Sequence, residues 1–375
     1  MQDEGPFASW SHVHSFEPDG AGTTVSDSVS FELPGGAVGR LGNGLAASAL
    51  RRLFEFRHER LRHDLERHEA DASAARLRVA VTGASGTIGR ELVAFLESGG
   101  HEVLRLVRRA QTGPGELRWD PDRSTVERAG LEGLDAVVHL SGRRIDTRWS
   151  SRARNEITAS RIGSTRFLAG VLASLERPPA TLLAASAIGY YGDRGDEPLT
   201  EASGRGAGFL PRLCADWEAA TAPASRAGIR VVNLRTGVVL TPRATPLSRL
   251  LLPWRLGLGA TIDRGDAAVS WIAPDDVVGA ILHLLRAKGV SGPVNLSSPE
   301  PATLRELADT LARVLGRPRF LRAPGALVPI VLGQMGRETL LASQRVVPQQ
   351  LLASTFEFRY PGLERALRHA LGRYR

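Results

Sequence analysis

From Arg76 onward, short apolar runs alternate with amphipathic stretches, and this alternation constrains the fold more than any other feature of the sequence. It is typical of a parallel sheet whose two faces are both covered by helices. It therefore predicts an α/β fold with a doubly wound parallel sheet. The predicted strands lie at residues 77–82, 102–107, 136–140, 181–186, 230–234 and 294–296.

The first 70 residues follow a different pattern and are predicted to form a separate α+β segment. Residues 10–33 are typical of short extended segments, with alternation at 24–31 and turn signals at 18–20 and 34–36, which indicates antiparallel strands. Residues 45–68 place apolar side chains at helical spacing, which predicts a long amphipathic helix. So few elements cannot bury enough apolar surface to form an independent hydrophobic core. Residues 71–75 have no periodicity and are interpreted as a linker.

Composition and charge exclude several classes of protein. No apolar run approaches the roughly 20 residues that cross a bilayer, and the acidic, polar start does not look like a secretory signal. We therefore expect a cytoplasmic protein without membrane contact. The single cysteine, Cys214, excludes an intramolecular disulfide and a multi-cysteine zinc site. Lys288 is the only lysine, so few mechanisms that need a lysine are open to this chain.

The net charge of +8 is unevenly distributed, because the first 75 residues hold 7 arginines and 12 acidic residues. The arginines of the remaining chain are scattered and form no run interleaved with aromatic residues. We therefore expect a phosphate-bearing small ligand rather than nucleic acid as the partner.

The N-terminal segment contains five of the nine histidines, which raises the question of a metal site. His58, His63 and His68 are spaced by five residues, so their side chains cannot converge on one ion from a single helix. His12 and His14 can share a strand face, but two imidazoles with no carboxylate or thiolate nearby make a poor site. The sequence therefore predicts packing and surface roles for these histidines, and no metal.

A glycine-rich turn follows the first predicted strand and precedes an amphipathic helix. Gly83 permits a tight turn, Gly86 lets the backbone approach a pyrophosphate, and Gly89 lets the helix pack closely on the sheet. A glycine triplet alone is a weak signal, but the flanking strand and helix supply the required context. The predicted cofactor-binding residues of this turn and of the loop after strand 136–140 are Gly83, Ser85, Gly86, Thr87, Ile88, Gly89, Leu140, Ser141 and Gly142.

The end of the second predicted strand indicates which dinucleotide is bound. An NAD enzyme would offer an acidic residue to the ribose hydroxyls there, whereas this chain has Arg108 and Arg109. A cation favours the 2′-phosphate of NADP. The sequence therefore predicts NADP as the cofactor, with Arg108 as the main contact. The alternative is a solvated arginine pair at a strand end.

Several further motifs resemble those of extended short-chain dehydrogenases/reductases, and in particular the atypical "epimerase family". The resemblance implies a Rossmann-type NADP-binding domain with substrate-region insertions over 76–323 and a C-terminal cap over 324–375. It rests on residues 82–89, 134–142, 185–187, 189–193, 213–218, 233–240, 255–259, 271–278, 293–296, 343–348 and 356–361. The first 70 residues resemble the last part of a polyketide-cyclase-like helix-grip domain, through His14, Phe16, residues 22–23, 33–34 and 54–58.

The resemblance also identifies candidate catalytic residues. In the wider superfamily a serine acts with a Tyr-x-x-x-Lys pair, whose lysine lowers the pKa of the tyrosine. No tyrosine here has a lysine four residues later, and the helix expected to carry the pair offers Leu210 and Cys214 instead. The resemblance implies that Ser186 keeps the place of the serine.

Two tyrosines and an arginine complete the predicted site. Tyr190 and Tyr191 lie in the loop after the strand of Ser186, where a phenol can meet a substrate oxygen. Arg235 ends the next strand and is predicted to bind a substrate phosphate or carboxylate. For each residue the alternative is a hydrogen bond that only closes a loop.

Two functions remain open at this point. The first is an NADP-dependent oxidoreductase or epimerase that acts on a nucleotide-linked sugar or another small anionic metabolite. The second is a non-catalytic NADP-binding protein whose cofactor stabilises a partner-binding surface. The retained Ser186 favours the first function, and the missing Tyr-x-x-x-Lys pair favours the second. The sequence does not indicate an oligomeric state.

Overall fold

The computed structural model describes residues 6–109, 112–262, 265–318 and 321–374. These residues divide into two compact units, Met1–Arg62 and His63–Arg373, and the division falls inside one long helix. Each unit is described by itself below.

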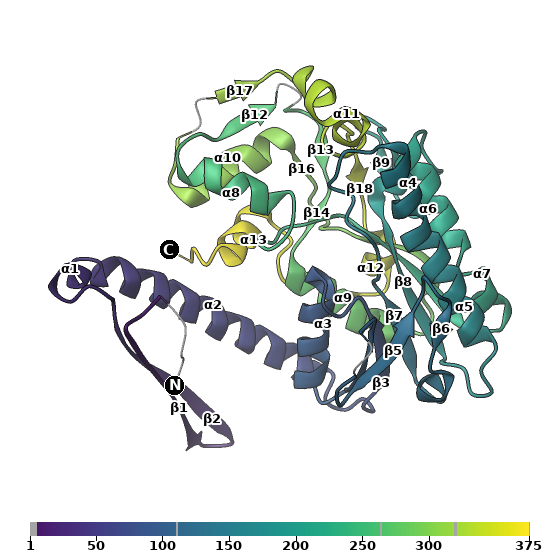
Figure 1. The fold of residues 1–375 in the computed structure, drawn as a ribbon, viewed down its shortest axis with the longest axis horizontal. Helices are drawn as coiled ribbons and strands as arrows, with labels where there is room; N and C mark the ends of the chain where they lie inside the picture. The colour runs from purple at the N-terminus through teal and green to yellow at the C-terminus, as the bar shows by residue number, and fades with distance from the viewer. Residues whose placement is uncertain (1–5, 110–111, 263–264, 319–320, 375) are drawn as a thin grey trace. The chain divides into compact units, whose positions relative to one another are not determined.

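The N-terminal unit contains an antiparallel ribbon followed by helices (Figure 1). Strands β1 (Ser9–Asp19) and β2 (Gly22–Glu32) pair along their whole lengths, which confirms the predicted strands. Helix α1 (Ala37–Arg40) and the long helix α2 (Asn43–Ala70) follow, and α2 confirms the helix predicted at 45–68. No hydrophobic residue among the described residues 6–62 is buried. These residues therefore form no hydrophobic core of their own, as expected for so few elements.

The predicted boundary between the segment 1–70 and the linker 71–75 lies too late in the chain, because the end of α2 belongs to the larger unit. His63 is buried and hydrogen-bonds through Nδ1 to the hydroxyl of Tyr360 at 3.0 Å. Further along, Arg286 donates two hydrogen bonds to the carboxylate of Asp71, at 2.9 and 2.7 Å. These partners lie far away in the sequence, so no local pattern indicates the contacts.

The larger unit is built around an eight-stranded sheet with the order β15-β10-β8-β7-β3-β4-β5-β6. All neighbouring strands run parallel except β5 and β6. The six predicted strands are confirmed, and β5 and β6 extend the sheet at one edge. The strands are β3 (Arg78–Thr82), β4 (Glu102–Val107), β5 (Glu116–Asp120), β6 (Thr125–Val126), β7 (Ala136–His139), β8 (Thr181–Ala187), β10 (Arg230–Thr236) and β15 (Gly292–Leu296).

Helices cover both faces of this sheet, which confirms the doubly wound architecture (Figure 1). Helices α3 (Thr87–Ser98) and α9 (Pro274–Arg286) pack with one face, around Leu92, Phe95 and Ile281. Helices α5 (Ser164–Ala173) and α7 (Ala222–Arg226) pack with the other. The remaining helical elements before the C-terminal region are η1 (Arg128–Leu131), α4 (Ser151–Thr158), η2 (Ala159–Gly163), η3 (Ile188–Tyr191) and α6 (Phe209–Ala219).

The C-terminal region has a third core, formed by buried side chains that include Trp254, Trp271 and Leu311. The predicted cap 324–375 does not form a compact unit of its own, because it belongs with the sheet to residues 63–373. The reason is that short strands within and just before the cap pair with earlier parts of the chain. β18 (Arg345–Val346) pairs with β9 (Pro198–Leu199), and β17 (Leu321–Ala323) pairs with β12 (Ala260–Ile262). The elements are β9 (Pro198–Leu199), β11 (Val238–Val239), α8 (Leu247–Arg255), β12 (Ala260–Ile262), β13 (Ala268–Val269), β14 (Trp271–Ile272), β16 (Ala302–Thr303), α10 (Leu304–Leu315), β17 (Leu321–Ala323), α11 (Leu327–Thr339), β18 (Arg345–Val346), α12 (Gln349–Ala353) and α13 (Leu363–Ala370).

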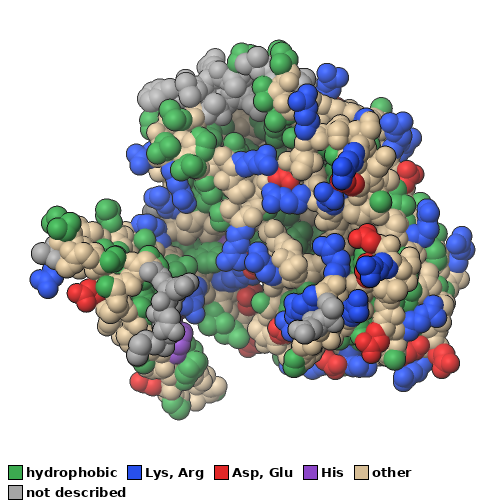
Figure 2. Space-filling view, in the orientation of Figure 1, with side chains coloured by type: hydrophobic (Ala, Val, Ile, Leu, Met, Phe, Trp, Pro, Cys, Tyr) green, Lys and Arg blue, Asp and Glu red, His purple; other side chains and the backbone are tan. Residues whose placement is uncertain are grey.

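The surface gives two observations that bear on the expected partners. Within the described ranges, no helix is both long enough and apolar enough to cross a membrane. On the face that Figure 2 shows, basic side chains are spread over many elements and do not gather into one patch.

A buried carboxylate at the start of α9 makes the stability of the larger unit depend on pH. Asp276 accepts hydrogen bonds from the backbone N–H groups of Arg359 and Tyr360, at 2.7 and 2.9 Å, and from Arg67 at 3.1 Å. Its burial nevertheless raises its pKa from 3.8 to about 6. Protonation therefore favours the folded state: this group's contribution is complete below about pH 4 and is lost as the pH rises through about 6.

We expect Asp276→Asn to remove this dependence. The free energy of unfolding of the wild type, relative to the variant, should fall by up to about 3 kcal/mol between pH 4 and pH 7. Urea unfolding at a series of pH values measures the difference. Asp216→Asn, which removes an exposed carboxylate, is the control for the general effect of such a substitution. A pH-independent difference for Asp276→Asn would contradict the prediction.

Candidate functional site

The glycine-rich turn lies where the strand order of the sheet reverses. β3 has β4 on one side and β7 on the other, and the carboxyl ends of β3 and β7 meet at this point. Gly83 has a φ of +69°, and a Cβ there would lie 2.8 Å from the carbonyl carbon and oxygen of Leu140. A Cβ at Gly89 would lie 2.2 Å from the carbonyl oxygen of Gly83. Both positions accept only glycine, so the turn, the β7 loop and α3 are in close contact.

Two buried polar side chains hold the ends of β3 and β7 together. The hydroxyl oxygen of Thr82 accepts a hydrogen bond from the N–H of Leu140 at 3.1 Å and lies 2.8 Å from Nδ1 of His139. The other ring nitrogen of His139 lies 3.4 Å from the hydroxyl of Ser164. Burial lowers the pKa of His139 to about 4, so the imidazole is neutral at pH 7. No local sequence pattern marks Thr82 and His139 as supports of the loop.

The N-terminus of α3 fits a phosphate group. Gly86 is the N-cap residue, no side chain caps the helix, and its first turn has no acidic residue. Ser85 and Gly86 are exposed, whereas Thr87 and Ile88 are half-buried. Backbone N–H groups at such a terminus carry a partial positive charge and can donate to a phosphate. On the neighbouring β7 loop, Leu140 and Ser141 are half-buried and Gly142 is exposed.

The two arginines after β4 differ in their surroundings. Arg109 forms an ion pair with Glu116, whose carboxylate also accepts the N–H of Gly113 at 2.9 Å. Arg108 is exposed, and no hydrogen bond or ion pair joins its side chain to the described part of the chain. The guanidinium of Arg108 is therefore available to an external anion, whereas that of Arg109 already has a counter-ion.

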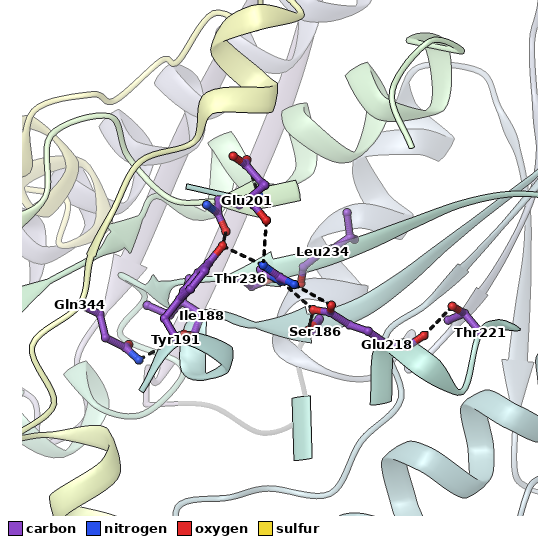
Figure 3. Close-up of polar contacts among 11 residues, drawn as sticks. Ser186, Ile188, Tyr191, Glu201, Glu218, Thr221, Leu234, Thr236 and Gln344 are labelled. Atoms are coloured by element: carbon purple, nitrogen blue, oxygen red, sulfur yellow. Dashed lines mark hydrogen bonds and ion pairs between the residues drawn. The ribbon is translucent and has the colours of Figure 1, made fainter. Parts of the chain in front are cut away.

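The structure brings Ser186, Tyr191 and Arg235 together, but through an acidic residue that sequence reasoning missed. Glu218 lies on α6 and accepts a hydrogen bond from the hydroxyl of Ser186 at 2.7 Å (Figure 3). Arg235 donates to both carboxylate oxygens of Glu218, each at 2.8 Å. The hydroxyl of Tyr191 accepts from Arg235 at 3.0 Å and donates to Oδ1 of Asn295 at 2.7 Å. The signal was present, because Glu218 ends the motif Leu-Cys-Ala-x-Trp-Glu.

This network does not match the predicted role of Arg235. Its side chain is 3% exposed, and its charge is balanced by Glu218, so the guanidinium is not available to a substrate anion. Tyr191 is fully buried, and burial raises its pKa even though Arg235 acts in the opposite direction. The arrangement corresponds to the alternative considered for these residues, hydrogen bonds that close the loop after β8.

Tyr190 is the least buried of the three predicted catalytic residues. It is half-buried, and its ring centroid lies 3.6 Å from Cζ of Arg235, which places a cation against the π face. No hydrogen bond joins its hydroxyl to another residue of the described ranges. Arg194, four residues later, pairs with Glu197 at 2.7 Å and so is engaged elsewhere.

The resemblance implies a lysine on α6 at a position where this chain has a cysteine. Cys214 stands at that position, and burial raises the pKa of its thiol to about 12, so it is unreactive. Arg161 contributes its charge to the surroundings of Cys214 and lies with Cζ 5.1 Å from the ring centroid of Trp217. A Cβ at Gly142 would lie 3.4 Å from the same Cζ. Arg161 of η2 thus places a cation beside the β7 loop.

A glycine turn at the reversal point of a doubly wound sheet, open at a helix N-terminus, defines a dinucleotide-binding protein of the Rossmann type. Comparison with known families agrees. The family model described as "NAD dependent epimerase/dehydratase family" matches residues 79–297, and a domain of unknown function, DUF1731, matches residues 323–370. The chain belongs to the NAD dependent epimerase/dehydratase family.

Individual relatives support this assignment. An epimerase family protein of Mycobacterium bovis is 40% identical over 296 residues, which span 79% of this chain and 98% of that protein. The human epimerase family protein SDR39U1 is 35% identical over 78% of this chain and 99% of its own length.

Two solved structures are similar over different lengths. The structure of human SDR39U1 (isoform 2) with NADPH has a TM-score of 0.72 and 33% identity, and covers 78% of this chain and 99% of that one. A nucleoside-diphosphate sugar epimerase from Corynebacterium glutamicum has a TM-score of 0.78 and 36% identity. It covers 99% of this chain and 73% of that chain, so its likeness includes the N-terminal unit.

Proposed function

We propose that this protein binds NADP and acts as an oxidoreductase or epimerase on a nucleotide-sugar-like or other anionic metabolite. The observation that carries the cofactor assignment is the unpaired, exposed guanidinium of Arg108 at the end of β4, beside the glycine turn. The NADPH in the structure of human SDR39U1 supports it. The substrate class is supported by the description of the Corynebacterium relative as a nucleoside-diphosphate sugar epimerase.

Each part of the cofactor has residues that fit it. The N–H groups at the start of α3 would hold the pyrophosphate, and Arg108 would hold the 2′-phosphate. A bound nicotinamide supplies hydride transfer. On the protein side, the half-buried Tyr190 has a hydroxyl with no hydrogen-bond partner among the described residues, and this hydroxyl would move a proton to or from a substrate oxygen. Ser186 and Glu218 position Arg235 under the ring of Tyr190.

The hydrogen bonds among the buried side chains around Glu218 favour a second function. Ser186, Tyr191 and Arg235 all have partners within the protein, and the superfamily's tyrosine and lysine positions hold Leu210 and Cys214. A protein with these features can bind NADP without turning it over and present a surface that the cofactor stabilises. Loss of NADPH absorbance that requires an added sugar nucleotide, and that Tyr190→Phe abolishes, supports the enzyme. NADPH that stays unoxidised across the panel supports the binding protein.

The cofactor assignment gives a direct prediction. Arg108→Ala should weaken NADPH binding by about 10-fold to 100-fold and leave NADH binding unchanged, because only NADPH carries the phosphate that this cation would meet. Titration of protein fluorescence with each nucleotide measures both affinities.

Arg109→Ala is the matched control, because Arg109 lies next in the chain but already has Glu116 as its counter-ion. It should change the ratio of the two affinities much less than Arg108→Ala does. Equal affinities of the wild type for NADH and NADPH, unaltered by Arg108→Ala, would refute NADP as the preferred cofactor.

A further inference from the structure

Three histidines of the N-terminal unit surround the carboxylate of Asp27. Nε2 of His12 and Nδ1 of His14 lie 2.7 and 2.6 Å from its Oδ1 atom. Nε2 of His58, on α2, lies 2.7 Å from its Oδ2 atom. The side chain of Asp27 is 7% exposed, that of His12 15% and that of His14 44%. The cluster is thus closed on one side and open to solvent on the other, and Figure 2 shows histidine side chains at the surface of this unit.

The strand register produces this convergence. His12 and His14 are two residues apart in β1, so they point to the same face of the ribbon. Asp27 stands directly opposite His14 in β2 and shares that face. The ring of His12 packs edge-on against Phe54 of α2 at a centroid distance of 5.1 Å, which fixes its orientation.

We propose that His12, His14 and Asp27 form a zinc site, with Nε2, Nδ1 and a carboxylate oxygen as ligands and a fourth position open to water. These three ligand atoms lie within 4.8 Å of one another. Tetrahedral zinc with ligands at about 2.0–2.1 Å needs ligand atoms roughly 3.3 Å apart, which small movements of the exposed His14 and of the Asp27 carboxylate provide. His58 is a positioning residue, because it holds the second carboxylate oxygen.

The donor set favours zinc over the hard cations. Two imidazoles and one carboxylate suit Zn²⁺, whereas Mg²⁺ and Ca²⁺ take oxygen ligands almost exclusively. The expectation of no metal rested on the lack of a carboxylate near His12 and His14 in sequence. The ribbon supplies that carboxylate from its other strand.

The unit also has a physical need for such a site. The described side chains of residues 6–62 bury no core, and Phe16 in β1 is 68% exposed. Small units of this kind commonly depend on a metal for part of their stability. An ion held by β1 and β2, with its carboxylate ligand fixed by α2, would join all three elements.

The test uses the full chain, freed of metal with a chelator and titrated calorimetrically with ZnCl₂. We expect one Zn²⁺ per chain with a micromolar or tighter dissociation constant, and a rise in the unfolding temperature when zinc is added. Asp27→Asn and His14→Ala should each weaken binding by about 100-fold or more, and His58→Gln by about 10-fold. Co²⁺ in place of zinc should give the visible absorption of a tetrahedral site.

Two variants serve as controls. Asp19→Asn changes another carboxylate of the same ribbon, and His68→Ala changes another histidine of the same helix, so both should bind zinc as the wild type does. Circular dichroism establishes that each variant is folded; if Asp27→Asn is not, the half-exposed His14 decides the test. Absence of zinc binding by the wild type, or equal binding by His14→Ala, would overturn the proposal and leave a hydrogen-bonded histidine cluster.

Discussion

The Glu218→Gln variant is expected to lose about 3–5 kcal/mol of its free energy of unfolding. The substitution keeps the shape of the side chain but removes the charge that faces Arg235, which is 3% exposed and bonded to both carboxylate oxygens. The guanidinium of Arg235 is then buried without a counter-ion, and nothing offsets the free energy of removing its charge from water. Urea unfolding followed by circular dichroism measures the loss.

An exposed ion pair provides the comparison. Glu156 pairs with Arg152 at 2.9 Å and with Arg143 at 3.2 Å, but both arginine side chains are exposed, so Glu156→Gln should cost far less than Glu218→Gln. In Glu218→Gln with Arg235→Met, the loss should be smaller than the sum of the single losses, because the unpaired charge is gone. A loss below about 1 kcal/mol for Glu218→Gln would show that the pair contributes little to stability.

Gly89→Ala should reduce NADPH affinity by roughly 100-fold or more. The added Cβ would lie 2.2 Å from the carbonyl oxygen of Gly83, so α3 or the turn has to move. Either movement displaces the backbone N–H groups that are proposed to hold the pyrophosphate. Titration with NADPH measures the affinity, and thermal unfolding reports how far the change spreads.

The matched control is Gly163→Ala, because a Cβ at Gly163 meets no atom within 4 Å. This variant should bind NADPH as tightly as the wild type and be at least as stable, since alanine is the better helix former. Wild-type affinity in Gly89→Ala would mean that the nucleotide does not contact the start of α3.

The parts of the fold that were predicted correctly are those with a local cause. Buried parallel strands are short apolar runs, so β3, β7 and β8 are visible in the sequence without knowledge of their neighbours. The glycine turn is partly local, because Gly89 is required by its contact with Gly83, whereas Gly83 is also required by its contact with Leu140 after β7. The family resemblance through these same motifs was confirmed by the family match over 79–297.

The sequence predicted which residues of the candidate site lie close together, but not the contacts between them. Ser186 and Arg235 end adjacent parallel strands, so their proximity followed from the general geometry of such sheets. The choice of Glu218 as their common partner depended on how α6 packs, which no local pattern specifies. The same reason applies to Arg161, whose position beside Cys214 comes from the packing of separate helices.

The histidine cluster was only partly predictable from the sequence. A two-residue turn at Gly20 and Ala21 fixes the ribbon register and places His14 opposite Asp27. The turn signal and the alternation predict the two strands. The pairing of His14 with Asp27 follows only when the register of these strands is also worked out. His58 could not have been added in this way, because it depends on the packing of α2 against the ribbon.

The sequence by itself determined the class of the fold, the position of the dinucleotide turn and the positive charge at the end of β4, because each depends on residues close together in the chain. The tertiary structure decided which charges are free. Arg109 is paired with Glu116 while Arg108 is exposed, and Arg235 is neutralised by Glu218. An ion pair is selected by packing between distant elements, and burial then decides the cost of leaving either partner alone.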